Sequence, residues 1–477
     1  MPFEAQGKPV LLGSKAGGAI LSVVAISRIL SAIWKGKTEF HLSSPAAPSR
    51  SFVNSKEVNV SGPLLRGCLA AFVILLAPIV VVADAVTEWN EKTIAASAKA
   101  KELPAAASRT VAIVHTAMFD AVNSVEGRYS PYKFKVSAPS GSSPEAAGVA
   151  AAHTALLKLF PEQKADLDAA FAASLAKIPD GNGKTAGISV GEEVAAKILA
   201  LRASDGADAP TSYRPVTAAG AYVSTTLPIS SEWGHSTPWV MDRSSQFRPA
   251  PPPSLTGSVW ASDYNEVKDL GNKKSTVRTA EQTDIARFWI LAGPASWEPL
   301  VRHLASAPGR TLLQNARLFA LVELATADAY IAVFEAKYAF QFWRPITAIR
   351  NGDIDGNDAT IRVPDWEPTI DTPLHPEYPC AHCITSAAAR AVLESEFGVG
   401  PIPVFTMTSP TAPGVTRKWA SVKDWADEIS AARIYGGIHY RNSTGWPSNG
   451  QENWRISRPE LSEAHPLGLP RHHLHVR

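Results

Sequence analysis

Three short segments in the C-terminal half of the 477-residue chain carry most of its candidate chemistry. They are Lys337-x6-Arg344-Pro345, Pro379-Cys380-Ala381-His382 and Arg433-x5-His439. Together they supply three permanent cations and two imidazoles, and none of them contains an acidic residue. Lysine and arginine donate hydrogen bonds to oxyanions, and histidine can serve as a ligand, a nucleophile or a proton carrier. The segments therefore predict a site for a tetrahedral oxyanion, provided that the fold brings the three segments together.

The first segment is predicted to lie on and just after a helix. Lys337 and Arg344 are seven residues apart, about two helical turns, so a helix would project both from one face. Pro345 disfavours helical backbone at the residue before it, which places Arg344 near the C-terminal end of that helix.

The other two segments also carry local signals. Cys380 to His382 precede an alanine-rich run over 385–397, so we expect them at a helix N-terminus, where backbone N–H groups and the helix dipole favour an anion. Arg433 and His439 are six residues apart and would not share one face of an unbroken helix. Gly436-Gly437 between them is expected to bend the chain so that both converge.

The order and spacing of these segments resemble the split motif of the vanadium-dependent haloperoxidases and type 2 phosphatidic acid phosphatases. That motif reads K-x6-RP, then PSGH, then SR-x5-H. The resemblance covers roughly residues 256–457, and the phrases at 316–321, 326–330 and 342–345 resemble the bacterial branch of the haloperoxidase-like family. A weaker resemblance extends upstream through 117–123.

The resemblance implies a role for each matching position. Lys337, Arg344 and Arg433 would hold the oxygens of bound vanadate or phosphate. His439 would be the ligand to vanadium or the nucleophile that becomes phosphohistidine. His382 would be the acid–base group for hydrogen peroxide or a leaving alcohol. One cationic cage can serve both chemistries, because vanadate adopts the trigonal bipyramid through which phosphoryl transfer passes.

Four positions depart from the family motif. Cys380 and Ala381 replace the serine and glycine that help to bind the cofactor, and a thiol is a weaker donor than a hydroxyl. Ala432 replaces the serine before Arg433. Ser443 stands where an aspartate is expected four residues after His439, which is expected to leave that imidazole less firmly oriented.

Three functions follow from this pattern. The first is a vanadium haloperoxidase-like peroxidase that binds vanadate and oxidises halide with hydrogen peroxide. The second is a secreted acid phosphatase that acts on a phosphoester through phosphohistidine. The third is a non-catalytic helical protein whose site has decayed. The net charge of +2, with no long basic block, argues against a nucleic-acid partner.

The N-terminal part predicts a leader. An apolar run over 69–83 follows Arg66 and ends in Ala83-Asp84-Ala85, an A-x-A cleavage pattern. The run is shorter than the roughly 20 residues that a membrane span needs, so residues 1–85 are interpreted as a leader with a signal peptide. The mature chain would then have no membrane span and would be secreted or periplasmic.

Without that leader, Cys380 and Cys383 are the remaining cysteines. A C-x-x-C pair in an oxidising compartment can form a disulfide or take part in redox exchange. Two cysteines are too few for a typical zinc site, although His375 and His382 lie close in sequence and keep metal binding open. The simplest alternative is that Cys380 replaces the family serine and Cys383 packs in the core.

The remaining pattern predicts an all-α fold, a helical bundle of the haloperoxidase and acid phosphatase type. Apolar residues recur at three- and four-residue spacing, and no alternating strand pattern stands out. We expect an N-terminal helical region with a long irregular connection over 86–255, a catalytic bundle over 256–457 and a polar tail over 458–477.

Overall fold

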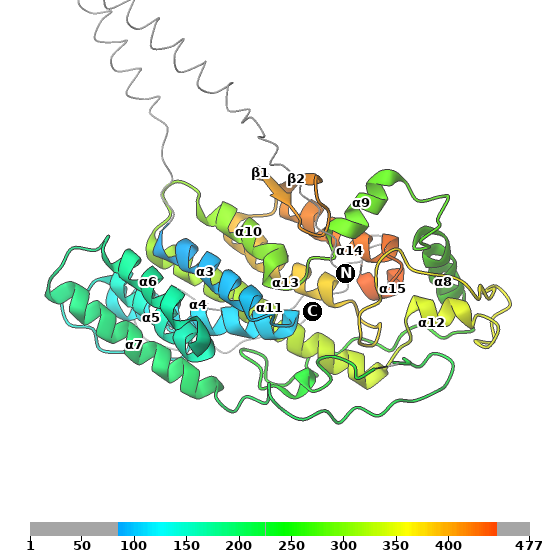
Figure 1. Cartoon of the computed structure of the whole chain (residues 1–477), viewed down its shortest axis with the longest axis horizontal. Coiled ribbons are helices and arrows are strands. Elements are labelled where there is room, and N and C mark those ends of the chain that lie inside the picture. Colours follow the sequence, from blue (N-terminus) through cyan, green and yellow to red (C-terminus); the bar gives the residue numbers. More distant parts are fainter. Residues whose placement is uncertain (1–83, 225, 446–477) are drawn as a thin grey trace, which may run out of the picture. The chain divides into compact units, whose positions relative to one another are not determined.

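The computed structural model describes residues 84–445 except residue 225, and these residues belong to one compact unit, Ile79–Arg477. The predicted leader therefore lies outside the described residues except for Asp84 and Ala85, and the predicted tail lies outside them entirely. The fold is all-α, as predicted, with one small hairpin (Figure 1). Within the described part of the chain, no helix is both long and apolar enough to cross a lipid bilayer.

The N-terminal helices pack as a layered group. They are α3 (Ala85–Lys99), α4 (Pro104–Glu126), α5 (Pro144–Leu159), α6 (Lys164–Leu175) and α7 (Asn182–Arg202), with the short η1 (Pro161–Gln163) before α6. Helices α5 and α7 approach closely because α7 carries Gly187 and Gly191 at the crossing. A Cβ at Gly191 would lie 2.2 Å from the Ala147 carbonyl oxygen, so a larger residue there would force the helices apart.

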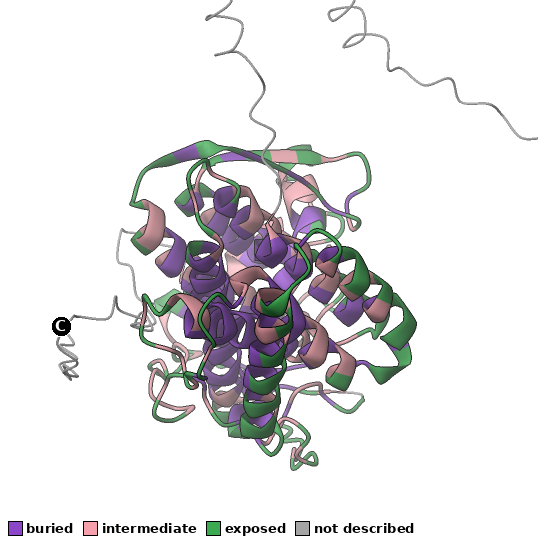
Figure 2. Ribbon diagram, turned by 90° about the vertical axis from the view of Figure 1, so that its left-hand side faces the viewer, coloured by how far each residue is buried: buried purple, intermediate pink, exposed green. Residues whose placement is uncertain are grey.

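Helix α11 (Leu312–Phe340) is the centre of the fold. A capping box fixes its start, in which Thr311 and Gln314 each bond the other's backbone N–H. Its residues are apolar on nearly every face, which is the pattern of a helix surrounded by protein. It packs against α4 and against α13 (Ala381–Phe397), and Figure 2 shows the buried residues concentrated in the central helices. Lys337 is thereby carried on the most buried helix.

The remaining helices of the described residues follow the irregular connection after α7. They are α8 (Ser258–Leu270), α9 (Ala280–Phe288), α10 (Pro294–Ala305), α12 (Pro345–Arg350), α14 (Val422–Tyr435) and α15 (Arg441–Thr444). A second, aromatic core forms where α8 meets the segments after α11 and α14. Trp260 packs there against Trp343 and Tyr440, with ring centroids 5.8 and 4.9 Å away. This core contains Trp343 and Tyr440, which are the chain neighbours of Arg344 and His439.

The expectation that no strand occurs is wrong for one hairpin. Strands β1 (Pro401–Thr408) and β2 (Thr416–Ser421) pair antiparallel. The register shifts between Pro401 and Phe405, so the buried residues of β1 are Ile402, Phe405 and Met407, which do not alternate strictly. The irregularity explains why this stretch of sequence has no alternating hydrophobic pattern with a period of two.

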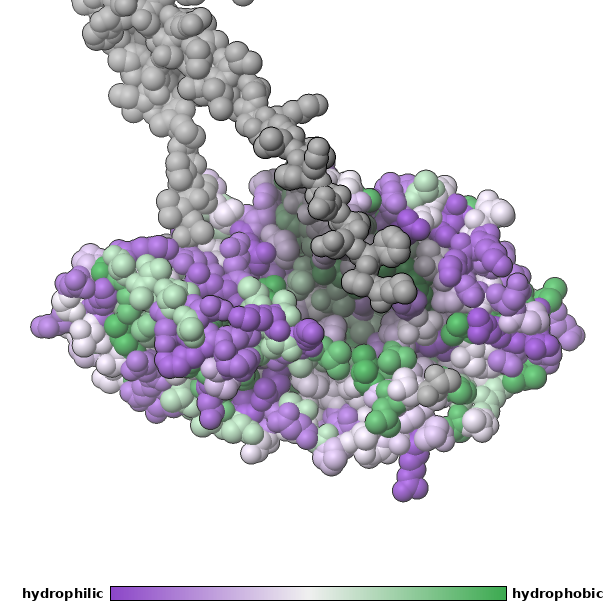
Figure 3. Space-filling model, in the orientation of Figure 1, coloured by the Kyte–Doolittle hydropathy of each residue, from purple (hydrophilic) through white to green (hydrophobic). Residues whose placement is uncertain are grey.

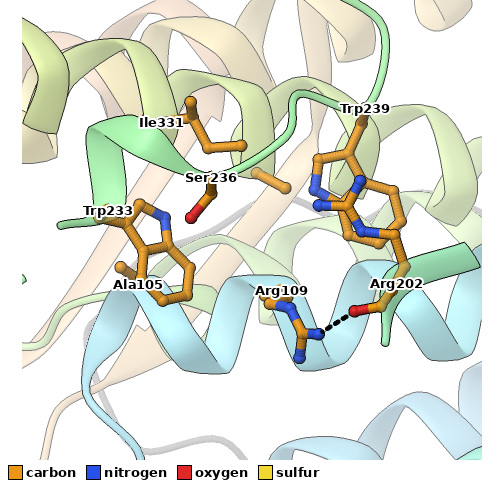
Figure 4. Close-up of a pocket in the computed structure, with 8 residues that line it drawn as sticks. Ala105, Arg109, Arg202, Trp233, Ser236, Trp239 and Ile331 are labelled. Carbon is orange, nitrogen blue, oxygen red and sulfur yellow. Dashed lines mark hydrogen bonds between the residues drawn. The ribbon is translucent and has the colours of Figure 1, made fainter. Parts of the chain in front are cut away.

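The irregular connection predicted between α7 and α8 is confirmed, with the single-turn η2 (Trp233–His235) as its regular element among the described residues. Its tryptophans act as anchors: Trp233 and Trp239 are buried, and the Arg202 guanidinium lies 4.0 Å from the Trp239 ring centroid. Figure 4 shows the two rings on either side of a small pocket above α4, where Arg109 donates to the Arg202 carbonyl oxygen at 2.8 Å.

The carboxylate of Asp328 on α11 fixes the same connection. It accepts hydrogen bonds from the backbone N–H groups of Trp239, Val240 and Met241 at 2.7, 2.8 and 2.8 Å. Asp328→Asn is expected to lower the free energy of unfolding by about 1.5–3 kcal/mol, because an amide cannot replace all three charge-assisted bonds. Urea denaturation checks this value, and a variant as stable as the wild type would contradict it.

Candidate oxyanion site

The structure brings the five predicted cationic and imidazole side chains into one buried cluster. Lys337 lies in the last turn of α11, Arg344 at the N-cap of α12, and Arg433 in the last turn of α14. Arg344 Nη1 lies 3.1 Å from His439 Nε2. Burial and the charges of Arg344, Lys337 and Arg433 lower the pKa of His439 well below its usual value.

His382 belongs to the same cluster and stands in the first turn of α13. Its Nε2 lies 3.3 Å from the Leu291 carbonyl oxygen. Because a carbonyl only accepts, Nε2 carries the proton in this contact and Nδ1 is the acceptor. Burial lowers the pKa of His382 well below its usual value, and the charge of Arg433 lowers it further. Both effects favour the neutral imidazole over the charged one.

The backbone features predicted from the sequence create this convergence. Helix α14 ends at Tyr435, and Gly437 adopts a φ of +77° that redirects the chain toward His439. A Cβ at Gly437 would lie 2.3 Å from the Gly271 carbonyl oxygen, so glycine is required there for packing as well as conformation. Arg344 has extended backbone before Pro345, as predicted. The expectation that one helix projects both Lys337 and Arg344 is wrong, because α11 ends at Phe340 and Arg344 is the N-cap of α12.

The three cations are held by backbone carbonyl groups. Lys337 Nζ donates to the carbonyl oxygens of Pro376 and Glu377 at 2.9 and 2.8 Å. Arg344 Nε donates to the His375 carbonyl oxygen at 2.9 Å, and Nη1 donates to that of Ile438 at 2.8 Å. Arg433 Nη1 donates to the Trp289 carbonyl oxygen, while its Nε is buried without a hydrogen-bond partner.

Positive charge is therefore concentrated away from water. Lys337, Arg344 and Arg433 are 0, 1 and 2% exposed. Burial lowers the pKa of Arg344 to about 10, against the opposing charge of Glu377. Burial and the charge of Arg344 together lower the pKa of Arg433 to about 9. Buried charges are costly unless paired, so this cluster is chemically suited to an added anion.

Sequence reasoning missed Glu377 and considered His375 only as a possible metal ligand. Glu377 Oε1 lies 2.7 Å from His439 Nδ1, and the residue is fully buried. His375 Nδ1 lies 3.0 Å from Arg344 Nη2. The expectation that Ser443 leaves His439 less firmly oriented is thus wrong, because Glu377 provides a carboxylate from another segment. An acidic residue two positions before Pro379-Cys380 was the available sequence signal.

The cysteines at the start of α13 form a disulfide between Cys380 and Cys383. Cys380 is the N-cap of the helix, as predicted, and Ala381 is its first residue. The Cys380 sulfur is consequently bonded to Cys383 and offers no hydrogen to an oxyanion. The alternative in which Cys380 is a free thiol in the place of serine is therefore wrong.

Figure 3 shows that the face of the molecule drawn in Figure 1 is hollowed over α13 and α14, and that apolar residues line much of the visible hollow. His382 at the start of α13 is partly exposed, unlike the three cations. A cluster whose acid–base candidate is the accessible member and whose cations lie deeper suits a small anion bound below a larger reactant.

Fold and cluster together define a helical protein with a buried group of cationic side chains, and its fold is similar to that of known proteins. Residues 317–448 match the family model described as the VCPO second helical-bundle domain. A curated vanadium chloroperoxidase of Curvularia inaequalis is 28% identical over 174 residues, which is 31% of this chain and 28% of that relative's length. This segment is therefore similar to the vanadium haloperoxidase-like family.

Solved structures extend the likeness beyond the matched segment. The structure described as the first bacterial vanadium-dependent iodoperoxidase has a TM-score of 0.64 at 25% identity, covering 77% of this chain and 94% of that one. A holo-type bacterial vanadium-dependent chloroperoxidase has a TM-score of 0.59 at 15% identity, covering 78% of this chain and 90% of that one. The second comparison supports the fold alone.

The unbalanced charge leads to a stability prediction. Arg433→Met is expected to raise the free energy of unfolding in oxyanion-free buffer by about 1–3 kcal/mol, because it removes a buried charge that lacks an anion. Arg417→Met is the matched control, since Arg417 pairs with Glu428 at 2.5 Å and Glu281 at 2.8 Å and its loss should destabilise. Urea denaturation compares the variants, and destabilisation by both would contradict the charge argument.

Proposed function

We propose that this protein is a vanadium-dependent haloperoxidase-like enzyme that binds vanadate and oxidises halide with hydrogen peroxide. The observation that carries the proposal is the charge of the cluster. Three buried cations act on the imidazole of His439, Arg344 contacts it directly, and the Glu377 carboxylate contacts it from the other side of the ring. The likeness to the vanadium haloperoxidases supports the same activity. The residues present fit vanadate, which needs cationic donors for its oxygens and one nitrogen ligand.

Each residue has a defined task in this proposal. Lys337, Arg344 and Arg433 would hold the vanadate oxygens, and His439 Nε2 would be the ligand to vanadium. When bound, vanadate would activate hydrogen peroxide toward a halide. His382 would move the peroxide proton, since it is partly exposed and its Nδ1 is free to accept in the tautomer that the Leu291 contact requires. The Cys380–Cys383 disulfide supports the proposed secreted or periplasmic location.

An acid phosphatase is the second candidate, and one contact favours it. His439 Nδ1 lies 2.7 Å from the Glu377 carboxylate, which is the arrangement that makes a histidine nucleophilic at its other nitrogen. The same cations would hold a phosphoester. His439 Nε2 would attack phosphorus as the ester P–O bond breaks, and the alcohol would leave with a proton from His382. Rates of bromide and iodide oxidation with added vanadate, measured beside hydrolysis of a phosphomonoester, separate the two candidates. Absence of both activities would favour a decayed site.

Vanadate binding tests the shared basis of both candidates. At about 100 times its dissociation constant, vanadate should stabilise the wild-type protein by about 2.7 kcal/mol, because it binds the folded state alone. His439→Ala should abolish that stabilisation, whereas His235→Ala, a change at an exposed histidine, should retain it. Thermal unfolding with and without vanadate measures the effect. Equal stabilisation of His439→Ala and the wild type would count against the assignment.

The disulfide allows a gain-of-affinity test. The double variant Cys380→Ser, Cys383→Ala restores the hydroxyl that the family motif carries, so vanadate should bind about 2–10-fold more tightly through one added hydrogen bond. The double variant Cys380→Ala, Cys383→Ala loses the disulfide without gaining a hydroxyl and is the control. Calorimetric titration compares them, and equal affinities would show that residue 380 does not contact the anion.

A further inference from the structure

The backbone of Glu377 is fixed by the cations of the site. Its N–H donates to the Phe342 carbonyl oxygen at 2.8 Å, just before Arg344. Lys337 Nζ donates to the carbonyl oxygens of Pro376 and Glu377. Contacts with the segment from Lys337 to Arg344 therefore fix the backbone of Glu377, and its side chain extends to His439 in the segment after α14.

One carboxylate oxygen of Glu377 receives three donors. Oε1 lies 2.7 Å from His439 Nδ1, 3.0 Å from the Tyr440 backbone nitrogen and 2.5 Å from Ser443 Oγ. All of these atoms are buried, so water does not compete for the oxygen. The Tyr440 and Ser443 contacts hold Oε1 in place for the imidazole.

Two independent contacts assign the same tautomer to His439. A carboxylate oxygen that already accepts from Tyr440 and Ser443 is an acceptor, so His439 Nδ1 must carry the proton. On the opposite side of the ring, Arg344 Nη1 can only donate and lies 3.1 Å from Nε2, so Nε2 must be unprotonated. The lone pair of Nε2 therefore faces the cations, which is where an oxyanion would bind.

Ser443 cannot perform this task alone. Its Oγ lies 3.3 Å from His439 Nδ1, but its hydrogen is directed to Glu377 or to the Tyr440 carbonyl oxygen at 2.9 Å. It occupies the sequence position of the aspartate in the family motif, so a carboxylate at either 377 or 443 could reach the same nitrogen. Position 443 thus offers a place to which the carboxylate can be moved.

We infer that Glu377 is a positioning residue that acts through His439: it fixes the imidazole with Nδ1 protonated and with the Nε2 lone pair directed at the oxyanion. Glu377 lies in the segment before Pro379, outside all three motif segments. The tautomer follows from contacts within the chain, whereas the effect on vanadate rests on the proposed function.

Nitrogen-15 NMR of histidine-labelled protein tests the tautomer without any anion, with His439→Ala to assign the signal. The wild type should show a protonated Nδ1 and an unprotonated Nε2. Glu377→Gln should keep this tautomer, because Tyr440 and Ser443 would hold the amide oxygen in the same place. Glu377→Leu should lose it. A wild-type signal with the proton on Nε2, or an unchanged signal in Glu377→Leu, would overturn the inference.

Affinity for two anions tests the consequence. Phosphate needs the cations, whereas vanadate also needs the lone pair of His439 Nε2. The ratio of the two affinities therefore measures whether that lone pair is available to the anion. Glu377→Leu should weaken vanadate relative to phosphate by about 10–100-fold, the usual cost of losing a residue that orients a metal ligand. Glu377→Gln should lose less, and Glu377→Gln with Ser443→Asp should regain affinity, because the carboxylate returns.

Asp328→Asn is the control for a general structural effect. It alters a buried carboxylate that contacts backbone groups of the connection and should leave the ratio of affinities unchanged. A ratio that stays at the wild-type value in Glu377→Leu would overturn the inference, and Glu377→Ala, which also removes the acceptor, supplies this result if Glu377→Leu does not fold. If the wild type binds phosphate but no vanadate, the proposed function fails, while the NMR result still tests the position of the proton.

Discussion

The burial of three cations beside a histidine is the constraint on which the rest of the structure depends. Lys337, Arg344 and Arg433 are removed from water, and burial lowers the pKa of each. Backbone carbonyl groups and the Glu377 carboxylate offset part of the cost. A site with this excess of positive charge is preorganised, because the cost of gathering the charges is met by folding rather than at the time of binding.

The fold provides the framework that makes such a site possible. Helix α11 is packed on several sides and ends at Gln341 in a left-handed conformation, so Lys337 has little freedom to move toward water. The aromatic core around Trp260 supports the segments that carry Arg344 and His439. A cluster carried by separate helices and loops keeps its geometry only if those elements are fixed relative to one another, and these cores fix them.

Local chemistry explains which features could be predicted from the sequence. The Pro345 and Gly436-Gly437 signals act on adjacent backbone, so the extended conformation at Arg344 and the turn before His439 followed from the sequence. The place of Cys380 at a helix N-cap followed in the same way. Glu377 could not be assigned, because its role depends on a contact with a residue 62 positions away. The Cys380–Cys383 disulfide was one of several outcomes that the spacing of the cysteines permits. The hairpin could not be predicted, because the shifted register of β1 removes the alternation of buried and exposed residues that indicates a strand.

A crystal structure of the protein soaked with orthovanadate tests the central claim most directly. The account predicts one anion in the cluster, with its oxygens within hydrogen-bond distance of Lys337, Arg344 and Arg433 and with vanadium bound to His439 Nε2. Arg344 Nη1 would then donate to the anion in place of its present contact with that nitrogen. A vanadate bound elsewhere, with these side chains unchanged and the cluster empty at saturating concentration, would contradict the account.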